Sequence, residues 1–370
     1  MIKKFLCLIL LVAAISSSGC ASSLSDVNKV IFITSVLVDV GDDNEPKIYF
    51  EGFRPLRTSS IDKKEDRVIF IFSGKTVSEV IDSLNTTASN KPNFSHNKVV
   101  LFSKRAAEMG LARYTDLFAR DQEHLLRSYV AIYEGNPVDL FNAKLPGDTF
   151  LGLYIYDLFR YYNLKSGKLL DIRVRDLFNG RYEYNGTSVV PILMSIKHIE
   201  KIPLVGGAAA LQDFKLVAVL PENDVSYYSI FQDIDQMSIY TIDNPMSPGN
   251  SLSLQVVKSR FKTKVIYNGT NIILIKKVEL DVTLREAQDS ITLTFDQQEQ
   301  IKQLLTQKLK ADCERFFDKY KAQSVDIFNL EEMFRRKYPR EKVINPIGKS
   351  LLDLSIDINL EGSGHYQSFR

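Results

Sequence analysis

The sequence predicts an α+β protein of mixed α/β type, with three domains whose mixed sheets are flanked by helices. Three observations support this. Apolar, β-rich runs alternate with stretches of helical period through the first half of the chain. A small β-rich block follows, and a long amphipathic helix is predicted in the last domain. With 45% hydrophobic and 25% charged residues, the composition argues against disorder and against a multi-span membrane protein.

Residues 1–19 have the pattern of a secretory signal. Lys3 and Lys4 precede an apolar run from Phe5 to Ile15, which is too short to cross about 30 Å of hydrocarbon as a helix. Small residues then lead directly to Cys20, an arrangement that resembles a bacterial lipobox. In such signals the cysteine receives a diacylglyceryl group and becomes the first residue of the mature chain. Ser17 stands where leucine is usual, so a plain secretory signal cut near residue 18 is the alternative.

Removal of this signal changes the charge of the chain. Residues 1–19 contain Lys3 and Lys4 but no acidic residue, so 45 basic residues remain against 45 acidic ones. A neutral chain offers no overall electrostatic attraction for nucleic acid, and we expect membrane attachment through acyl chains. Of the three cysteines, Cys7 leaves with the signal and Cys20 is the predicted lipidation site, so no intramolecular disulfide is expected.

The first predicted domain spans residues 20–183 and begins with a short polar tether at 20–28. It alternates strands with helices, and one helix begins at Thr76, which together with Glu79 forms a predicted capping box. Gly110 marks a break or a new start in a second helical stretch. The strand patterns cover 29–39, 47–53, 68–72, 98–103 and 128–134, and the helical patterns cover 76–84, 105–120, 148–161 and 171–179.

Two further domains are predicted after a turn at 184–187. A small β-rich middle domain spans 184–245, and a C-terminal α/β domain spans 246–370. In the last domain we expect two strands over 252–260 and 261–267, the Asn268-Gly269 turn of a hairpin, and a returning strand over 272–284. A long helix at about 296–322 carries an apolar stripe that includes Leu304 and Cys313, and a half-buried strand over 351–360 closes the fold.

The sequence offers few residues for chemistry. Cys313 lies on the apolar stripe of its helix, which favours a buried, inert thiol. No two histidines have metal-ligand spacing, and Gly206-Gly207 lacks the context of a dinucleotide or phosphate loop, so close backbone approach or a bulge is expected. Arg335-Arg336-Lys337 is interpreted as a solvated helix end rather than a headgroup contact. We therefore predict no catalytic residue, no metal and no cofactor besides the lipid on Cys20.

Tyrosine and phenylalanine are abundant, with 17 and 22 residues, while tryptophan is absent. Four tyrosines gather on the helical pattern that follows residue 148. Packing in the core is the simpler explanation, and a partner-protein surface is the alternative, because tyrosine is favoured at interfaces. The four are Tyr154, Tyr156, Tyr161 and Tyr162.

The order of these features resembles the Ger(x)C lipoproteins, the C subunits of the nutrient germinant receptors of bacterial endospores. The resemblance covers nearly the whole chain from Cys20. The segments that carry it are Gly74-Lys-Thr-Val-Ser-Glu-Val-Ile-Asp-Ser-Leu84, Phe94-Ser-His96-Asn-Lys98-Val-Val-Leu-Phe102, Tyr129-Val-Ala-Ile-Tyr-Glu-Gly135-Asn-Pro-Val-Asp139, Gly207-Ala-Ala-Ala-Leu-Gln-Asp-Phe-Lys215-Leu-Val-Ala-Val-Leu220, Ser324-Val-Asp326-Ile-Phe328 and Phe334-Arg-Arg-Lys-Tyr-Pro339.

The chain also departs from the family pattern. Cys20 is followed by Ala-Ser-Ser-Leu-Ser instead of the usual Trp-containing start, and Asn329 stands where a glycine is usual. The resemblance implies a non-enzymatic receptor subunit, needed for receptor assembly or signalling, that is lipid-anchored at the outer face of the spore inner membrane. Its implied partners are two polytopic membrane subunits. The alternatives are a solute-binding lipoprotein, which would need a deep interdomain cleft, and a lipid-anchored hydrolase, which would need a converged catalytic cluster.

Overall fold

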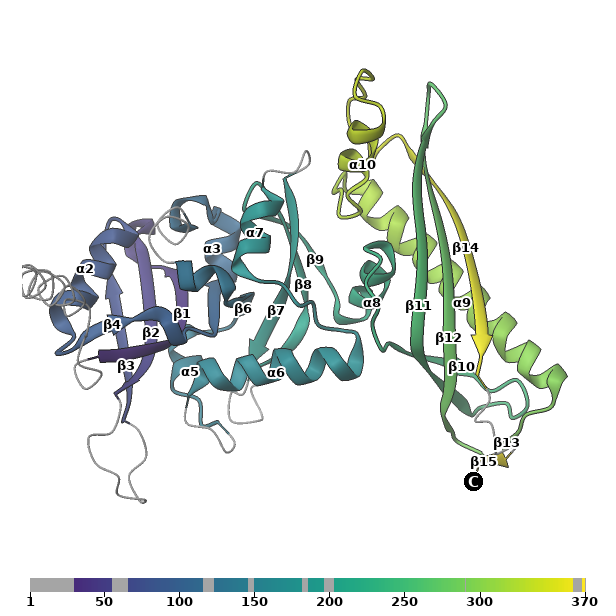
Figure 1. The fold of residues 1–370 in the computed structure, drawn as a ribbon, viewed down its shortest axis with the longest axis horizontal. Helices are drawn as coiled ribbons and strands as arrows, with labels where there is room; N and C mark the ends of the chain where they lie inside the picture. The colour runs from purple at the N-terminus through teal and green to yellow at the C-terminus, as the bar shows by residue number, and fades with distance from the viewer. Residues whose placement is uncertain are drawn as a thin grey trace, which may run out of the picture.

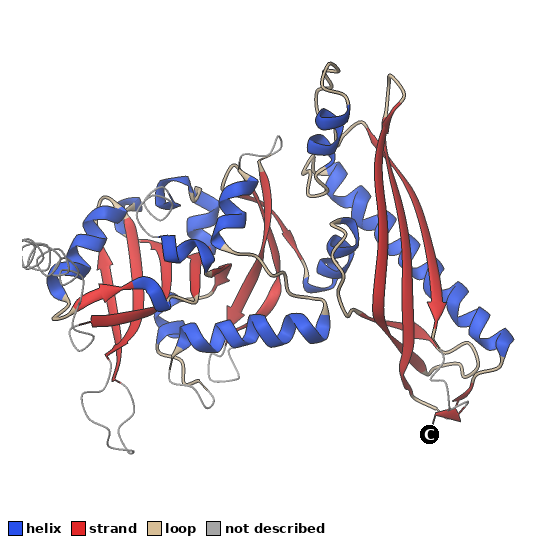
Figure 2. Ribbon diagram, viewed as in Figure 1, coloured by secondary structure: helices blue, strands red, loops and turns tan. Residues whose placement is uncertain are grey.

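The structure is a computed structural model that describes residues 30–54, 66–115, 123–145, 150–181, 186–195, 203–289, 291–361 and 368–369. Its strands form two main sheets, one of nine strands and one of four, each covered by helices (Figures 1 and 2). The nine-stranded sheet occupies the N-terminal part of the molecule and the four-stranded sheet occupies the C-terminal part. The predicted α+β class, with mixed sheets and flanking helices, is confirmed.

The large sheet has the strand order β3-β2-β1-β5-β6-β7-β8-β9, with β4 pairing beside β1. Strands β1, β5, β6 and β7 run parallel, whereas both flanks of the sheet are antiparallel. Helices therefore connect the central strands and hairpins extend the edges. The strands are β1 (Val30–Val40), β2 (Pro46–Arg54), β3 (Asp66–Ser73), β4 (Lys91–Asn93), β5 (Val99–Ser103), β6 (Tyr129–Glu134), β7 (Thr187–Ser195), β8 (Pro203–Gln212) and β9 (Lys215–Leu220).

Helices cover both faces of this sheet. One face packs against α2 (Val77–Thr87), α3 (Lys104–Met109) and α7 (Val174–Gly180), and the other packs against α5 (Pro137–Phe141) and α6 (Leu151–Ser166). The 3-10 turns among the described residues of this part are η2 (Asp42–Asn44), η3 (Phe94–His96) and η4 (Glu123–Arg127). The Thr76 hydroxyl accepts a hydrogen bond from the amide of Glu79, as predicted. The Glu79 carboxylate, however, accepts from the amide of Lys75 rather than from that of Thr76.

The small sheet has the order β10-β11-β12-β14, and the long helix α9 (Phe295–Ala322) packs on one of its faces. Thr294 caps α9 through a capping box with Gln297. The predicted stripe is buried along the helix, but Leu304 is 38% exposed and lies outside it. The other elements are α8 (Glu222–Phe231), β10 (Ile239–Asp243), β11 (Ser251–Tyr267), β12 (Ile272–Ala287), α10 (Leu330–Lys337) and β14 (Ser350–Leu360), with a minor pair of β13 (Ile291–Thr292) and β15 (Ser368–Phe369).

One strand prediction needs correction. Residues 252–260 and 261–267 form the single strand β11, because the bulge near Val257 bends the strand without ending it. The strands of the predicted middle block lie in both main sheets: β7, β8 and β9 continue the N-terminal sheet, while β10 joins the C-terminal one. The three-domain division at residues 184 and 246 stays a prediction.

A buried lysine lies in the core of the C-terminal part. Lys276 follows the inward-facing period of β12, and its side chain has no exposed area. Its Nζ donates to the Phe231 carbonyl at 3.2 Å and to the Thr263 hydroxyl at 2.9 Å, and it forms an ion pair with Asp233. Burial lowers the pKa of the Lys276 amine. The lysine thereby ties the end of α8 to the centre of the sheet.

A buried carboxylate organises the N-terminal part. Helix α6 has Phe150 at its N-cap, which provides no side-chain cap. Instead Glu51 of β2, fully buried, accepts hydrogen bonds from the amides of Leu151 at 2.8 Å and Gly152 at 3.0 Å. Arg67 of β3 donates to the same carboxylate at 2.6 Å. Further hydrogen bonds to Glu51 come from the hydroxyls of Thr34 and Ser35.

The Glu51 carboxylate accepts hydrogen bonds from both the N-terminus of α6 and Arg67, so its removal should destabilise the folded protein. We expect Glu51→Ala to lower the free energy of unfolding by about 3 kcal/mol, since it leaves the Arg67 Nε and two buried amides without their acceptor. Urea unfolding followed by circular dichroism measures the change. The control is Glu108→Ala, an exposed glutamate on α3. Equal unfolding midpoints for the two variants would contradict the role of Glu51.

Candidate functional site

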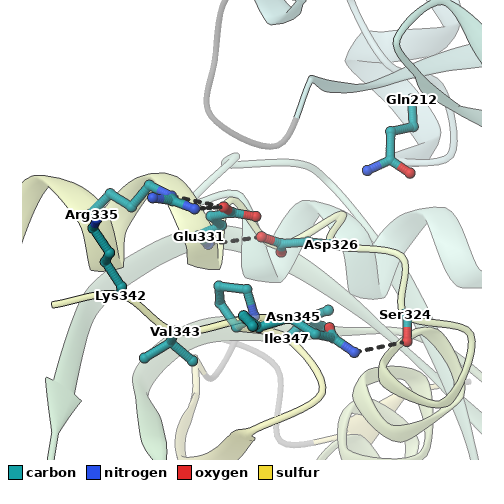
Figure 3. A pocket seen from close by; sticks show the side chains of 11 residues that line it. Gln212, Ser324, Asp326, Glu331, Arg335, Lys342, Val343, Asn345 and Ile347 are labelled. Atoms are coloured by element: carbon teal, nitrogen blue, oxygen red, sulfur yellow. Dashed lines mark hydrogen bonds and ion pairs between the residues drawn. The ribbon is translucent and has the colours of Figure 1, made fainter.

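The candidate functional site is a cleft of ≈ 570 Å³ where the N-terminal sheet meets the C-terminal part of the chain (Figure 3). Gln212, at the end of β8, lies on one side. The opposite side comes from the segment that leaves α9, from α10 and from the loop before β14. The lining residues on that side are Ser324, Asp326, Glu331, Arg335, Lys342, Val343, Ile344, Asn345, Pro346 and Ile347.

Asp326 positions α10 at the floor of the cleft. Asn329 adopts a left-handed conformation, with φ of 53°, and has no side-chain cap of its own. The Asp326 carboxylate instead accepts from the amides of Phe328 at 3.1 Å, Leu330 at 3.1 Å and Glu331 at 2.8 Å. A carboxylate at a helix N-terminus is also favoured by the helix dipole. This acidic group is therefore largely engaged in fixing the backbone.

The basic residues of α10 contact nearby groups of the same chain or face solvent. Arg335 pairs with Glu331 at 2.7 Å, one turn earlier on the helix, and Figure 3 shows this pair facing the cleft. The Lys337 amine donates to the Val265 carbonyl of β11 at 2.8 Å. Arg336 is 75% exposed. These contacts agree with the predicted helix end, since each long cation satisfies a nearby acceptor or faces solvent.

The loop before β14 forms the remaining wall. Asn345 donates to the Ser324 hydroxyl at 3.2 Å and accepts from the Gly348 amide at 3.0 Å, which fixes the turn. Ile347 is buried beneath it, whereas Ile344 is 87% exposed at the rim. The hydrogen-bonded turn thus holds one apolar side chain in solvent at the rim of the cleft.

The two parts of the molecule are joined beside the cleft by a shared core. Residues of β8, β9 and α8 pack in one apolar cluster with the stripe of α9. The Tyr320 hydroxyl of α9 donates to the Val219 carbonyl of β9 at 3.3 Å, and Lys319 pairs with Asp224 at 2.8 Å. Tyr227 of α8 donates to Asp312 at 2.8 Å. The cleft thus lies between walls that share a packed core.

The structure shows the surroundings of Cys313 and Gly207, two residues that the sequence singled out. Cys313 is fully buried, and burial raises the pKa of its thiol to about 12, so it is not an activated nucleophile. At Gly207, φ is +111° and an added Cβ would lie 2.2 Å from the Leu220 carbonyl, which confirms close backbone approach. Within the described ranges, no group of three or more His, Cys, Asp or Glu side chains could hold a metal ion. Cys20 lies outside the described residues.

The tyrosines of α6 divide between core and surface. Tyr154 and Tyr156 are half-buried against the core cluster on the α6 face of the large sheet, whereas Tyr161 is 55% exposed. The side chain of Tyr162 lies outside the described set. Packing therefore accounts for two of the four positions. No described helix is long and apolar enough to cross a membrane.

The fold and the cleft define an α+β protein built on two sheets, whose polar cleft groups mainly stabilise its own loops and helix ends. Two family models match the chain: the spore germination protein N-terminal domain over residues 24–194, and the spore germination B3/GerAC-like C-terminal domain over residues 206–362. Together they cover most of the chain. The protein therefore belongs to the GerAC-like family of spore germination proteins, as the resemblance predicted.

Individual comparisons agree with this assignment. Spore germination protein A3 of Bacillus subtilis (strain 168) is 28% identical over 159 residues, a match that covers 42% of this chain. In that match the chain spans 40% of the relative's own length. The crystal structure of the GerBC protein matches with a TM-score of 0.57 and 16% identity, covering 88% of this chain and 97% of that one. This second likeness concerns the fold alone.

The burial of Cys313 predicts that its thiol does not react in the folded protein. We expect the folded chain carrying Cys20→Ala, with its signal removed, to leave Cys313 unmodified by iodoacetamide at pH 8, because the thiol is buried and protonated there. Full modification should appear on unfolding in guanidinium chloride. Mass spectrometry counts the adducts. Rapid labelling of the folded chain at pH 8 would contradict the inert assignment.

Proposed function

We propose that the protein is the C subunit of a spore nutrient germinant receptor, anchored by lipid on Cys20 to the outer face of the spore inner membrane. It acts by protein–protein contact and carries no cofactor besides this lipid. Its partners are two polytopic membrane subunits of the receptor, and it does not bind nucleic acid. The observation that carries this proposal is the match of both family domains, in order, over residues 24–194 and 206–362.

The cleft supports a contact role more than a catalytic one. Asp326 accepts backbone amides and Glu331 pairs with Arg335, so these charges already have structural partners. Apolar Ile344 is 87% exposed at the rim, which suits insertion into a partner surface. We propose that this rim meets a membrane subunit, and that contact there contributes to receptor assembly or signalling.

The anchor is tested by changing one residue. We expect Cys20→Ala to release the protein from the membrane and to weaken nutrient-triggered germination, because without acyl chains a neutral chain has little affinity for a bilayer. Membrane fractionation with immunoblotting follows the protein, and loss of refractility on adding nutrient follows germination. The matched control is Ser22→Ala, two residues later in the tether. Normal membrane retention of Cys20→Ala would contradict lipid anchoring.

A solute-binding lipoprotein remains the second candidate, because ≈ 570 Å³ lies within the usual size range of ligand pockets. Calorimetric titration of the folded chain with the nutrients that trigger its spores distinguishes the two functions. Saturable binding that is lost in Lys342→Glu, at the cleft wall, would favour the solute-binding function. We expect no such binding, since most of the charges that line the cleft are engaged within the protein.

A further inference from the structure

One face of the C-terminal sheet is uncovered by any described element. Helices α8, α9 and α10 all pack on the side that carries the core, and Figure 1 shows the other side of β11, β12 and β14 open toward the viewer. Side-chain exposure agrees with this arrangement. Along β14, Leu351, Asp353, Ser355 and Asp357 are exposed, while Leu354 and Ile358 on the opposite face are buried. We call this side the open face.

The strand registers arrange the open face into rows across β11, β12 and β14. The row nearest the β11–β12 turn is apolar throughout, and charge enters from the second row onward. The four rows are Ile266–Ile273–Leu351, Lys264–Ile275–Asp353, Lys262–Lys277–Ser355 and Arg260–Glu279–Asp357. Read along the strands, β11 presents a basic column and β14 presents an acidic one.

Several of these charges lack a partner within the described part of the chain. Arg260 is satisfied, since it binds Asp281 through two hydrogen bonds of 2.7 and 2.9 Å and also contacts Glu279. Lys262 and Lys264 make no ion pair with a described residue, and neither do the acidic residues that β14 presents, Asp353 and Asp357. They cannot easily pair with each other, because β12 lies between their strands.

We propose that the open face binds the open face of a second copy of this chain, about a two-fold axis parallel to β12. Rotation about that axis places β11 of one copy over β14 of the other and keeps each row opposite its own counterpart. The basic column then faces the acidic column twice, with Lys264 opposite Asp353 of the other copy and Arg260 opposite Asp357. The apolar rows meet at one end, where Ile266 is 39% and Leu351 is 46% exposed.

The alternative symmetric packing is disfavoured by charge. A two-fold axis perpendicular to the strands would place β11 over β11, and the lysines of the basic column would then face one another. In the preferred arrangement, like charges face each other only next to the axis, where Lys277 and Glu279 each lie opposite the same residue of the other copy. With strands about 4.8 Å apart and rows about 7 Å apart, each copy contributes about 400 Å² of open face, the size of a weak, transient interface.

Cross-linking across the axis tests this pairing of open faces. The pairing does not rest on the proposed function. Ile275 lies next to the axis, so Ile275→Cys in the full-length chain should join two copies when the cell fraction that contains the chain is treated with a short bismaleimide. The control is Leu304→Cys, which is 38% exposed on the solvent side of α9. We expect at least fivefold more cross-linked dimer from Ile275→Cys than from Leu304→Cys or from the parent chain.

Exchanging the charges of Lys264 and Asp353 tests whether the basic and acidic columns hold the two copies together. In the Ile275→Cys background, Lys264→Asp should lower the dimer yield at least fivefold, because it places two acidic groups opposite each other at both symmetric positions. Adding Asp353→Lys should restore the yield, whereas Lys310→Asp on α9 should leave it unchanged. Dimer yields no higher than the Leu304→Cys control, a swap that fails to restore them, or cross-links to a different protein would each overturn the proposal.

Discussion

The apolar stripe of α9 is the constraint on which the rest of the structure depends. It buries one face of the C-terminal sheet, and through α8 its core extends to β8 and β9 at the edge of the N-terminal sheet. Because one core includes residues of both parts, the two parts line a common cleft. Tyr320 and Lys319 reinforce this junction with polar contacts to β9 and α8. The open face of the C-terminal sheet is a consequence of the same arrangement, since α9 covers only one side.

Local patterns predicted most elements, because burial and capping leave signatures over a few residues. Alternation located β14, the Asn268-Gly269 turn located the returning strand β12, and helical period located α2, α6 and α9. No short run of residues shows which strands will pair with each other. The sequence therefore did not reveal that β14 runs parallel to β12, that β10 joins the C-terminal sheet, or that β7 to β9 extend the N-terminal one. One missed feature was readable: Lys276 interrupts the buried period of Ile272, Leu274, Val278 and Leu280.

The candidate site was harder to predict than the fold. Its polar groups come from the end of β8 and from residues 324–347, which meet only in the folded chain. Glu51 illustrates the same limit, since a residue 100 positions away from α6 supplies its cap. Residue types alone also suggested helix-end roles for the basic residues of α10, and the structure agrees. The charged groups that line the cleft, Asp326, Glu331 and Arg335, mainly hold the loops and the helix end around them.

Our central proposal is that the protein works as one component of a membrane complex. Affinity isolation of the tagged full-length chain from detergent-solubilised spore membranes tests it most directly. We expect two polytopic membrane proteins to co-purify in constant ratio, and Ile344→Asp at the rim of the cleft to reduce their recovery while the chain stays folded. Isolation of the chain without these proteins, from spores that germinate normally, would contradict it.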